Sequence, residues 1–322
     1  KIIIHIIGVL LLFNGGLMLL SSLVSFLMKD GVTFEITLSS FLVMIFGGGM
    51  MLFCRHHKKQ IQKREGYLIV TLGWLLISLT GMLPYLLTGS IQEIPSAFFE
   101  TMSGYTTTGS SILTDIESIP AGVLFWRSMT HWIGGMGIIV LAVAILPMLG
   151  IGGMQLYRAE TPGPVKDSKL TPRIKETALA LWSIYLGLTF VCAIAYWGAG
   201  MSGFDAICHS FSTIAIGGFS THDASIGYFD SWAIEAIAIF FMILAGINFS
   251  LHFFSFKERS ILHYFRDDEV KFYLSILFTA TVAVTGVLWY EQTHTFGQAI
   301  RFGLFEVVSI FTTTGFSATD FA

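Results

Sequence analysis

The chain has 322 residues, of which 54% are hydrophobic and 12% are charged, and its formal net charge is −3. Soluble domains carry about 25% charged residues and lack apolar runs of 20 or more, so this composition argues against a soluble enzyme. The cysteines Cys54, Cys192 and Cys208 lie in or beside apolar segments, without zinc spacing or a readable disulfide framework, and we interpret them as small buried side chains.

Seven apolar segments are long enough to cross a bilayer, whose core of about 30 Å needs roughly 20 residues of helix. In chain order they cover residues 2–28, 36–54, 66–88, 121–149, 177–198, 229–253 and 272–290. The first is too long for a signal peptide and no small-residue cleavage site follows it, so we interpret it as a spanning helix. Its polar residues His5 and Asn14 are expected to form hydrogen bonds between helices.

Three shorter segments, at about residues 95–106, 203–214 and 297–311, follow spanning segments and end in clusters of Thr, Gly and Ser. Segments of this length are typical of core helices or of helices that enter a membrane and return. The sequence therefore predicts an all-α membrane protein in which spanning helices alternate with short pore helices.

The basic residues predict the orientation of the chain, because cytoplasmic loops carry an excess of Lys and Arg. All but three of the 18 basic residues fall at the N-terminus or in the loops after the second, fourth and sixth spans. The exceptions are Lys29, Arg127 and Arg301. We therefore expect a cytoplasmic N-terminus and three pore helices that enter from the outside.

The three short segments are copies of one unit, which becomes clear when they are aligned on Gly109, Gly218 and Gly315. Six residues before each glycine is a serine, two residues after it is another serine, and nine residues before it is a polar residue. Those polar residues are Glu100, His209 and Glu306. Internal repeats of this kind are common in membrane transporters and channels.

A Thr-Thr-Thr-Gly stretch after a short helix is suited to form an ion filter. Non-helical backbone at membrane depth is tolerated only where protein buries it or where it lines a watery cavity. Its carbonyl oxygens replace the water shell of a cation, and glycine adopts positive φ without strain. The predicted K⁺ ligands are Thr107, Thr108, Gly109, Ile216, Gly217, Gly218, Thr313, Thr314 and Gly315.

Several polar and aromatic residues near the filters have simpler expected roles. Glu100 and Glu306 are expected to form hydrogen bonds behind the filter or near its mouth rather than to bind the ion. For His209 we favour a satisfied buried histidine, with a pH sensor as the alternative.

Trp126 is predicted to be an interfacial anchor, like Trp132 and Trp232. Arg127 and His131 are expected to be structural, and Gly134, Gly135 and Gly137 to allow close packing beside the filter.

These motifs resemble the Trk/Ktr/HKT superfamily of potassium transporters, and most closely its bacterial TrkH branch. The strongest stretch covers residues 127–141, which include Trp132-Ile133-Gly134-Gly135-Met136-Gly137, and it continues through Pro147 to residues 152–164, which end in Glu160-Thr161-Pro162-Gly163-Pro164. The resemblance implies four repeats of helix, pore helix and helix around a pseudo-fourfold pore, preceded by two extra helices. It also implies a homodimer in the bacterial inner membrane, docked on a cytosolic nucleotide-binding ring of the TrkA type, with no organic cofactor and no nucleic acid bound.

The resemblance divides the chain into two N-terminal helices at 1–65, a first repeat at 66–172, a second at 173–266 and a third at 267–322. The third repeat ends seven residues after Gly315, so the fourth repeat is expected to be missing from this chain. In the second copy, Ala215-Ile216-Gly217 replaces three threonines, which favours a less symmetric filter.

The main functional hypothesis is potassium uptake without covalent chemistry, and the alternative is a potassium symporter coupled to Na⁺ or H⁺. An intramembrane enzyme needs a nucleophile with its base, or a metal cluster, and no such signature is present in the sequence.

Overall fold

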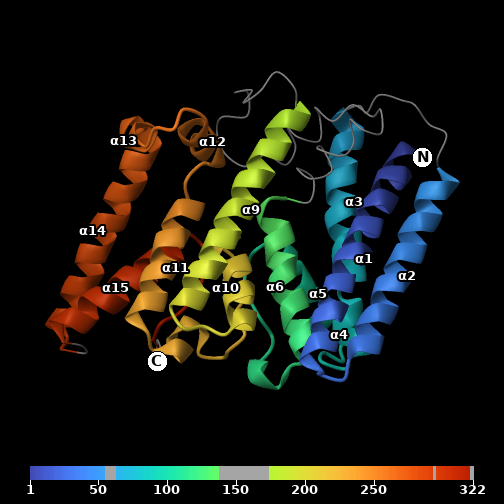
Figure 1. Ribbon diagram of the computed structural model, residues 1–322, viewed down its shortest axis with the longest axis horizontal. Helices are drawn as coiled ribbons and strands as arrows, with labels where there is room; N and C mark the ends of the chain where they lie inside the picture. The colour runs from blue at the N-terminus through green and yellow to red at the C-terminus, as the bar shows by residue number, and fades with distance from the viewer. Residues whose placement is uncertain (55–62, 138–173, 293–294, 320–322) are drawn as a thin grey trace. The chain divides into compact units, whose positions relative to one another are not determined.

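The computed structural model describes residues 1–54, 63–137, 174–292 and 295–319 (Figure 1). These residues form helices and connecting turns without any strand. Five helical segments among them are long and apolar enough to cross a membrane: Ile2–Met28, Thr33–Phe53, Glu65–Leu87, Leu179–Gly198 and Asp268–Tyr290. The described part of the chain is therefore that of an all-α membrane protein.

The chain divides into two compact units. The first unit comprises Lys1–Thr106 and Ser110–Trp182, and the second comprises Thr107–Gly109 and Ser183–Ala322. This division follows contacts in space, and the four segments expected from the repeats stay a prediction.

The first unit holds α1 (Ile2–Met28), α2 (Thr33–Phe53), α3 (Lys63–Gly81), α4 (Leu83–Leu87), α5 (Ile94–Tyr105), the short η1 (Ile116–Ser118) and α6 (Ala121–Gly135). Helix α1 lies beside α2, α3 and α6 (Figure 1). Glycines allow a close approach of α1 and α2, because a Cβ on Gly8 would lie 2.6 Å from the carbonyl oxygen of Gly47. His5 meets the carbonyl oxygen of Met51 on α2 at 3.1 Å, which confirms its expected role between helices.

Helix α9 (Ile174–Gly198) runs from the first unit into the second. The second unit continues with α10 (Gly203–Ile214), η3 (Ser225–Phe229), α11 (Trp232–Ala245), α12 (Phe249–Lys257), α13 (Leu262–Arg266), α14 (Asp268–Tyr290) and α15 (Phe296–Phe311). Helix α15 packs on α14 and α11, and α11 also packs on α10.

The three predicted short helices are confirmed as α5, α10 and α15, and each of their bounds lies within one residue of the expected position. The prediction for the sixth span was wrong in one respect. Residues 229–253 do not form one helix, because α11 ends at Ala245 and α12 begins only at Phe249. Of the fourth span, α6 covers Ala121–Gly135, and residues 138–149 lie outside the described residues.

Candidate functional site

The second unit brings the three glycine-containing filter copies together. A Cβ added to Gly109 would overlap the carbonyl oxygen of Gly217, and one added to Gly218 would overlap the carbonyl oxygen of Thr314. Each of these glycines therefore lies directly against the backbone of the next copy. All nine predicted ligand residues, at 107–109, 216–218 and 313–315, belong to this unit.

The three copies also share one unusual backbone conformation. The aligned glycines have φ values of 77° at Gly109, 85° at Gly218 and 81° at Gly315. Two residues earlier, Thr107, Ile216 and Thr313 have φ values of 53°, 48° and 63°. Positive φ is a true outlier for β-branched residues and persists only where the surroundings impose it. The same outlier recurs at the aligned position of all three copies, and strained backbone of this kind is typical of functional sites.

Backbone hydrogen bonds fix the filter segments to the ends of their own pore helices. The N–H of Gly217 donates to the carbonyl oxygen of Ser212 at 2.9 Å, and the N–H of Thr314 donates to that of Ser309 at 2.8 Å. These serines are the aligned residues six positions before the filter glycine. The bonds turn amide N–H groups toward the pore helices, so the partly negative carbonyl oxygens are the groups suited to meet a cation.

The polar residue nine positions before each glycine holds the chain that leaves the filter. Glu100 accepts from the N–H of Ile112 at 3.0 Å, and Glu306 accepts from the N–H of Ala318 at 2.8 Å. His209 meets the hydroxyl of Ser220 at 2.9 Å. The expected hydrogen bonding of these residues is confirmed. Glu100 and Glu306 each accept from the backbone N–H twelve residues later, whereas His209 bonds a serine hydroxyl.

Glu100 is also half of a buried ion pair. Its Oε1 accepts from Nε of Arg127 on α6 at 2.7 Å and from the hydroxyl of Ser111 at 2.9 Å. The side chains of Glu100 and Arg127 are 0% and 2% exposed. A buried charge is tolerated when it is paired and hydrogen-bonded, so Arg127 has the structural role that was expected.

His209 in the second copy is bonded on both ring nitrogens. Nδ1 lies 2.8 Å from the carbonyl oxygen of Asp205, which only accepts hydrogen bonds, so Nδ1 carries a proton. Nε2 lies 2.9 Å from the hydroxyl oxygen of Ser220, which also accepts from the N–H of His222. Both ring nitrogens of this buried side chain therefore have hydrogen-bond partners, which agrees with the satisfied buried histidine that the sequence favoured.

A second buried acid was not identified from the sequence. Glu235 on α11 is 1% exposed and receives two hydrogen bonds from Arg301 on α15, at 2.7 and 2.6 Å. Asp230 adds a longer contact to the same guanidinium at 3.3 Å. The available signal was an acidic residue within an apolar run, which in a membrane protein needs a partner.

Trp126 differs from its expected position. It was predicted as an interfacial anchor, but it is 0% exposed and its Nε1 donates to the carbonyl oxygen of Gly81 at 2.9 Å. Trp232 is 53% exposed, as an interfacial residue would be. Sequence position near a helix end does not distinguish the two, because the difference depends on which helix covers the ring.

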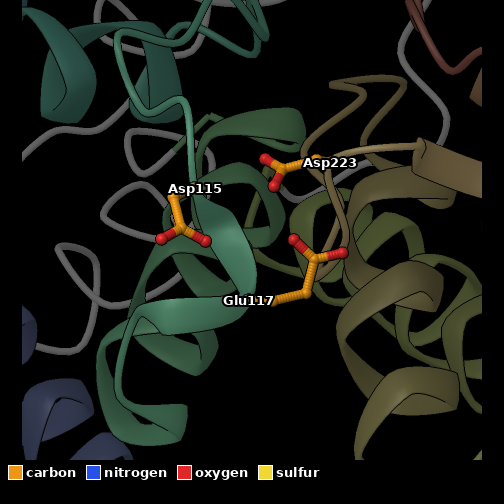
Figure 2. A group of neighbouring side chains, drawn as sticks. All are labelled: Asp115, Glu117 and Asp223. Atoms are coloured by element: carbon orange, nitrogen blue, oxygen red, sulfur yellow. The ribbon is translucent and has the colours of Figure 1, made fainter.

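Exposed carboxylates occur on the loops that follow the first two filter copies. Asp115 precedes η1 and Glu117 lies within it, in the first unit, and Asp223 lies before η3 in the second (Figure 2). The filter segments themselves contain no basic residue. Acidic loops next to filter segments favour cations over anions as the partners of this site.

Comparison with known proteins gives a consistent assignment. Residues 32–322 match the TrkH family, described as cation transport proteins. The chain is 49% identical to the Trk system potassium uptake protein TrkH of Halomonas elongata and 47% identical to the protein of the same name from Escherichia coli strain K12. Both alignments cover 100% of this chain and 67% of the relative.

The fold is also similar to a solved structure. The crystal structure of the potassium transporter TrkH from Vibrio parahaemolyticus superposes with a TM-score of 0.86 at 43% identity. The match covers 98% of this chain and 65% of that one. The chain thus spans about two thirds of the length of its relatives.

Proposed function

Because the chain belongs to the TrkH family of cation transport proteins, we propose that it carries potassium ions across a membrane through a filter of backbone carbonyl groups. The observation that supports this most directly is the threefold repetition of one strained backbone conformation, at Thr107, Ile216 and Thr313. A carbonyl-lined filter needs the same local geometry in each wall, because each wall supplies oxygens to the same ion.

The proposed ligands are the carbonyl oxygens of the nine filter residues at 107–109, 216–218 and 313–315. Potassium is the transported ion and no covalent step is involved. The C-terminal ends of α5, α10 and α15 precede these segments directly, and the partial negative charge of a helix C-terminus favours a cation there. The relatives bear the name of potassium uptake proteins, which supports potassium over other cations.

The proposed setting is the bacterial inner membrane, with the N-terminus in the cytoplasm. The distribution of Lys and Arg among the loops supports this orientation. The relatives are named as parts of a Trk system, and we place the chain in a homodimer docked on a cytosolic nucleotide-binding ring of the TrkA type. The non-repeated helices α1 and α2 and the repeats at 66–172, 173–266 and 267–322 form the proposed domain order.

Substitution of a filter glycine tests the proposal. In the full-length protein, Gly218→Ala forces a Cβ onto the carbonyl oxygen of Thr314 at a residue with positive φ. Left-handed backbone costs a non-glycine residue roughly 1–2 kcal/mol before any overlap is counted. We expect K⁺ uptake, or the preference for K⁺ over Na⁺, to fall roughly tenfold or more, measured in bacteria that lack other K⁺ uptake systems.

Gly89→Ala is the matched control. Gly89 also has positive φ, at 74°, but a Cβ there meets no atom within 4 Å and the residue lies outside the filter. The Gly89→Ala variant should therefore have the backbone strain without the steric overlap, and its preference for K⁺ should be unchanged. Normal uptake and normal discrimination in Gly218→Ala, with the protein present in the membrane at wild-type amounts, would overturn the proposed function.

A further inference from the structure

Helices α1 and α2 lie outside the repeats, and the proposed filter mechanism assigns them no task. They form a tight pair in the first unit, where the hydroxyl of Ser40 donates to the carbonyl oxygen of Gly15 at 2.6 Å. One polar side chain of α1 nevertheless points away from α2. Asn14 is 0% exposed, and it faces the last residue of the first pore helix.

That contact is a single buried hydrogen bond. The hydroxyl of Tyr105, the C-terminal residue of α5, donates to Oδ1 of Asn14 at 2.6 Å. The amide nitrogen of Asn14 has no hydrogen-bond partner among the described residues. A buried amide with one unused donor costs more free energy than an apolar side chain would, so packing alone does not account for an asparagine here.

Tyr105 is held from its other sides as well. Its ring meets the ring of Trp126 edge-on, with centroids 6.3 Å apart. A Cβ on Gly81 would lie 2.8 Å from its ring, and a Cβ on Gly134 would overlap its carbonyl oxygen. Contacts from α1, α3 and α6 therefore fix both the side chain and the backbone of this residue.

Tyr105 is followed by Thr106 and then by Thr107, the first filter residue and one of the three with positive φ. A strained conformation persists only where neighbouring structure imposes it. In the second copy a side-chain hydrogen bond to the last turn of the pore helix is made within the repeat, between the hydroxyls of Tyr196 on α9 and Thr213 on α10 at 2.9 Å. In the first copy it comes from outside the repeat, from α1.

A second contact joins the N-terminal pair to the helix that follows the first filter. Oδ2 of Asp30, in the turn between α1 and α2, accepts from the N–H of Gly122 at 2.7 Å and so caps the N-terminus of α6. A Cβ on Gly122 would lie 2.6 Å from Cβ of Ser25 on α1. The pair thus contacts both helices that flank the first filter in the chain.

We propose that helices α1 and α2 are a buttress for the first filter copy, and that Asn14 is its positioning residue, acting on ion selectivity through Tyr105. This inference rests on the proposed function. It predicts that a side chain on a helix outside the repeats sets how well the filter distinguishes K⁺ from Na⁺, without touching the ion.

The test uses the full-length protein and two variants that remove the same bond from its two ends. Asn14→Leu removes the acceptor, and Tyr105→Phe removes the donor while it keeps the ring in place. We expect each to lower the ratio of K⁺ to Na⁺ uptake roughly two- to tenfold, the range that corresponds to one hydrogen bond. The double variant should be no worse than either single one, because the two changes remove one interaction.

His5→Leu is the matched control, because it removes another hydrogen bond of α1, to Met51, that leads to α2 and not to the filter. Its K⁺/Na⁺ ratio should equal that of the wild type. If Asn14→Leu does not accumulate in the membrane, Tyr105→Phe carries the test.

An unchanged K⁺/Na⁺ ratio in Tyr105→Phe overturns the inference, and so does a slower uptake of both ions in equal proportion, which indicates a general structural role. If the wild type itself does not prefer K⁺, the proposed function fails instead, so the two failures are distinguishable.

Discussion

The residues at one aligned position hold the chain after the filter in two ways, through a glutamate carboxylate in the first and third copies and a histidine ring in the second. Each copy of the repeat must hold the chain that leaves the filter, and it does so with Glu100, His209 or Glu306. The first copy adds an ion pair with Arg127, and both Glu100 and His209 bond the hydroxyl of the aligned serine, Ser111 or Ser220. The symmetry of the repeat is therefore a symmetry of backbone position and not of charge.

The buried ion pair of the first copy leads to a stability prediction. Arg127→Met leaves Glu100 charged, buried and without its partner, which typically costs about 3–5 kcal/mol. We expect the thermal unfolding midpoint of the purified full-length protein in detergent to fall clearly. The double variant Arg127→Met with Glu100→Gln should recover much of the loss, because no buried charge remains. A double variant as unstable as Arg127→Met alone would contradict this account of the pair.

For single residues, the sequence predicted that a polar residue lies nine positions before each filter glycine, but it did not predict the positive φ values two positions before that glycine. The spacing of Glu100, His209 and Glu306 from the filter glycines is visible in the sequence and proved meaningful. The positive φ of Thr107 and Ile216 is not visible there, because local preference of a β-branched residue opposes it and only contacts from distant residues impose it. Trp126 was misplaced for a similar reason, since its burial depends on Gly81.

Among the elements, the interrupted sixth span shows how a break in a helix is held. Ring nitrogen Nε2 of His252 on α12 meets the carbonyl oxygen of Leu244, in the last turn of α11, at 2.9 Å. Its other nitrogen meets the hydroxyl of Tyr264 on α13 at 2.8 Å. One histidine therefore connects both sides of the break to the short helix beyond it.

Removing this connection should loosen the region without unfolding the protein. We expect His252→Ala to raise amide hydrogen exchange in peptides that cover residues 246–266, because two hydrogen bonds of roughly 0.5–1.5 kcal/mol each are lost. Peptides from α14 should be unaffected. His263→Ala is the control, since its pairing with Glu258 is exposed and pairs of that kind contribute little. Equal exchange in both variants would show that His252 does not hold the break.

The positions of the helices were predicted better than the breaks within the apolar segments. Length and hydropathy were sufficient to locate α1, α2, α9, α14 and the three pore helices. They did not reveal the gap between Ala245 and Phe249, because residues 229–253 are predominantly apolar and a single glycine is tolerated within a helix. The break depends on packing instead, since a Cβ on Gly246 would lie 2.6 Å from the hydroxyl of Tyr273 on α14.

For the whole molecule, the distribution of basic residues makes the orientation in the membrane testable. Thr114 follows the first filter and Glu258 lies in the loop after the sixth span, and both are exposed. In intact cells whose outer membrane is permeable to it, a thiol reagent that does not cross the inner membrane should label Thr114→Cys. It should label Glu258→Cys only after the inner membrane is opened.

The native thiols do not interfere with this experiment, because Cys54, Cys192 and Cys208 are buried at 3%, 0% and 1% exposure. The unsubstituted chain, treated in the same way, measures any remaining background. Labelling of Glu258→Cys in intact cells would reverse the orientation inferred from Lys and Arg.

The head-to-tail contact of the filter copies has a consequence for how this protein evolves. Gly109 lies against the carbonyl of Gly217, and Gly218 lies against that of Thr314, so each copy sets the space available to its predecessor. Substitutions in one copy are therefore constrained by the neighbouring copy. A second copy without the three threonines has to be compatible with the first and third copies that it contacts. We therefore expect residues around the filter to covary among relatives.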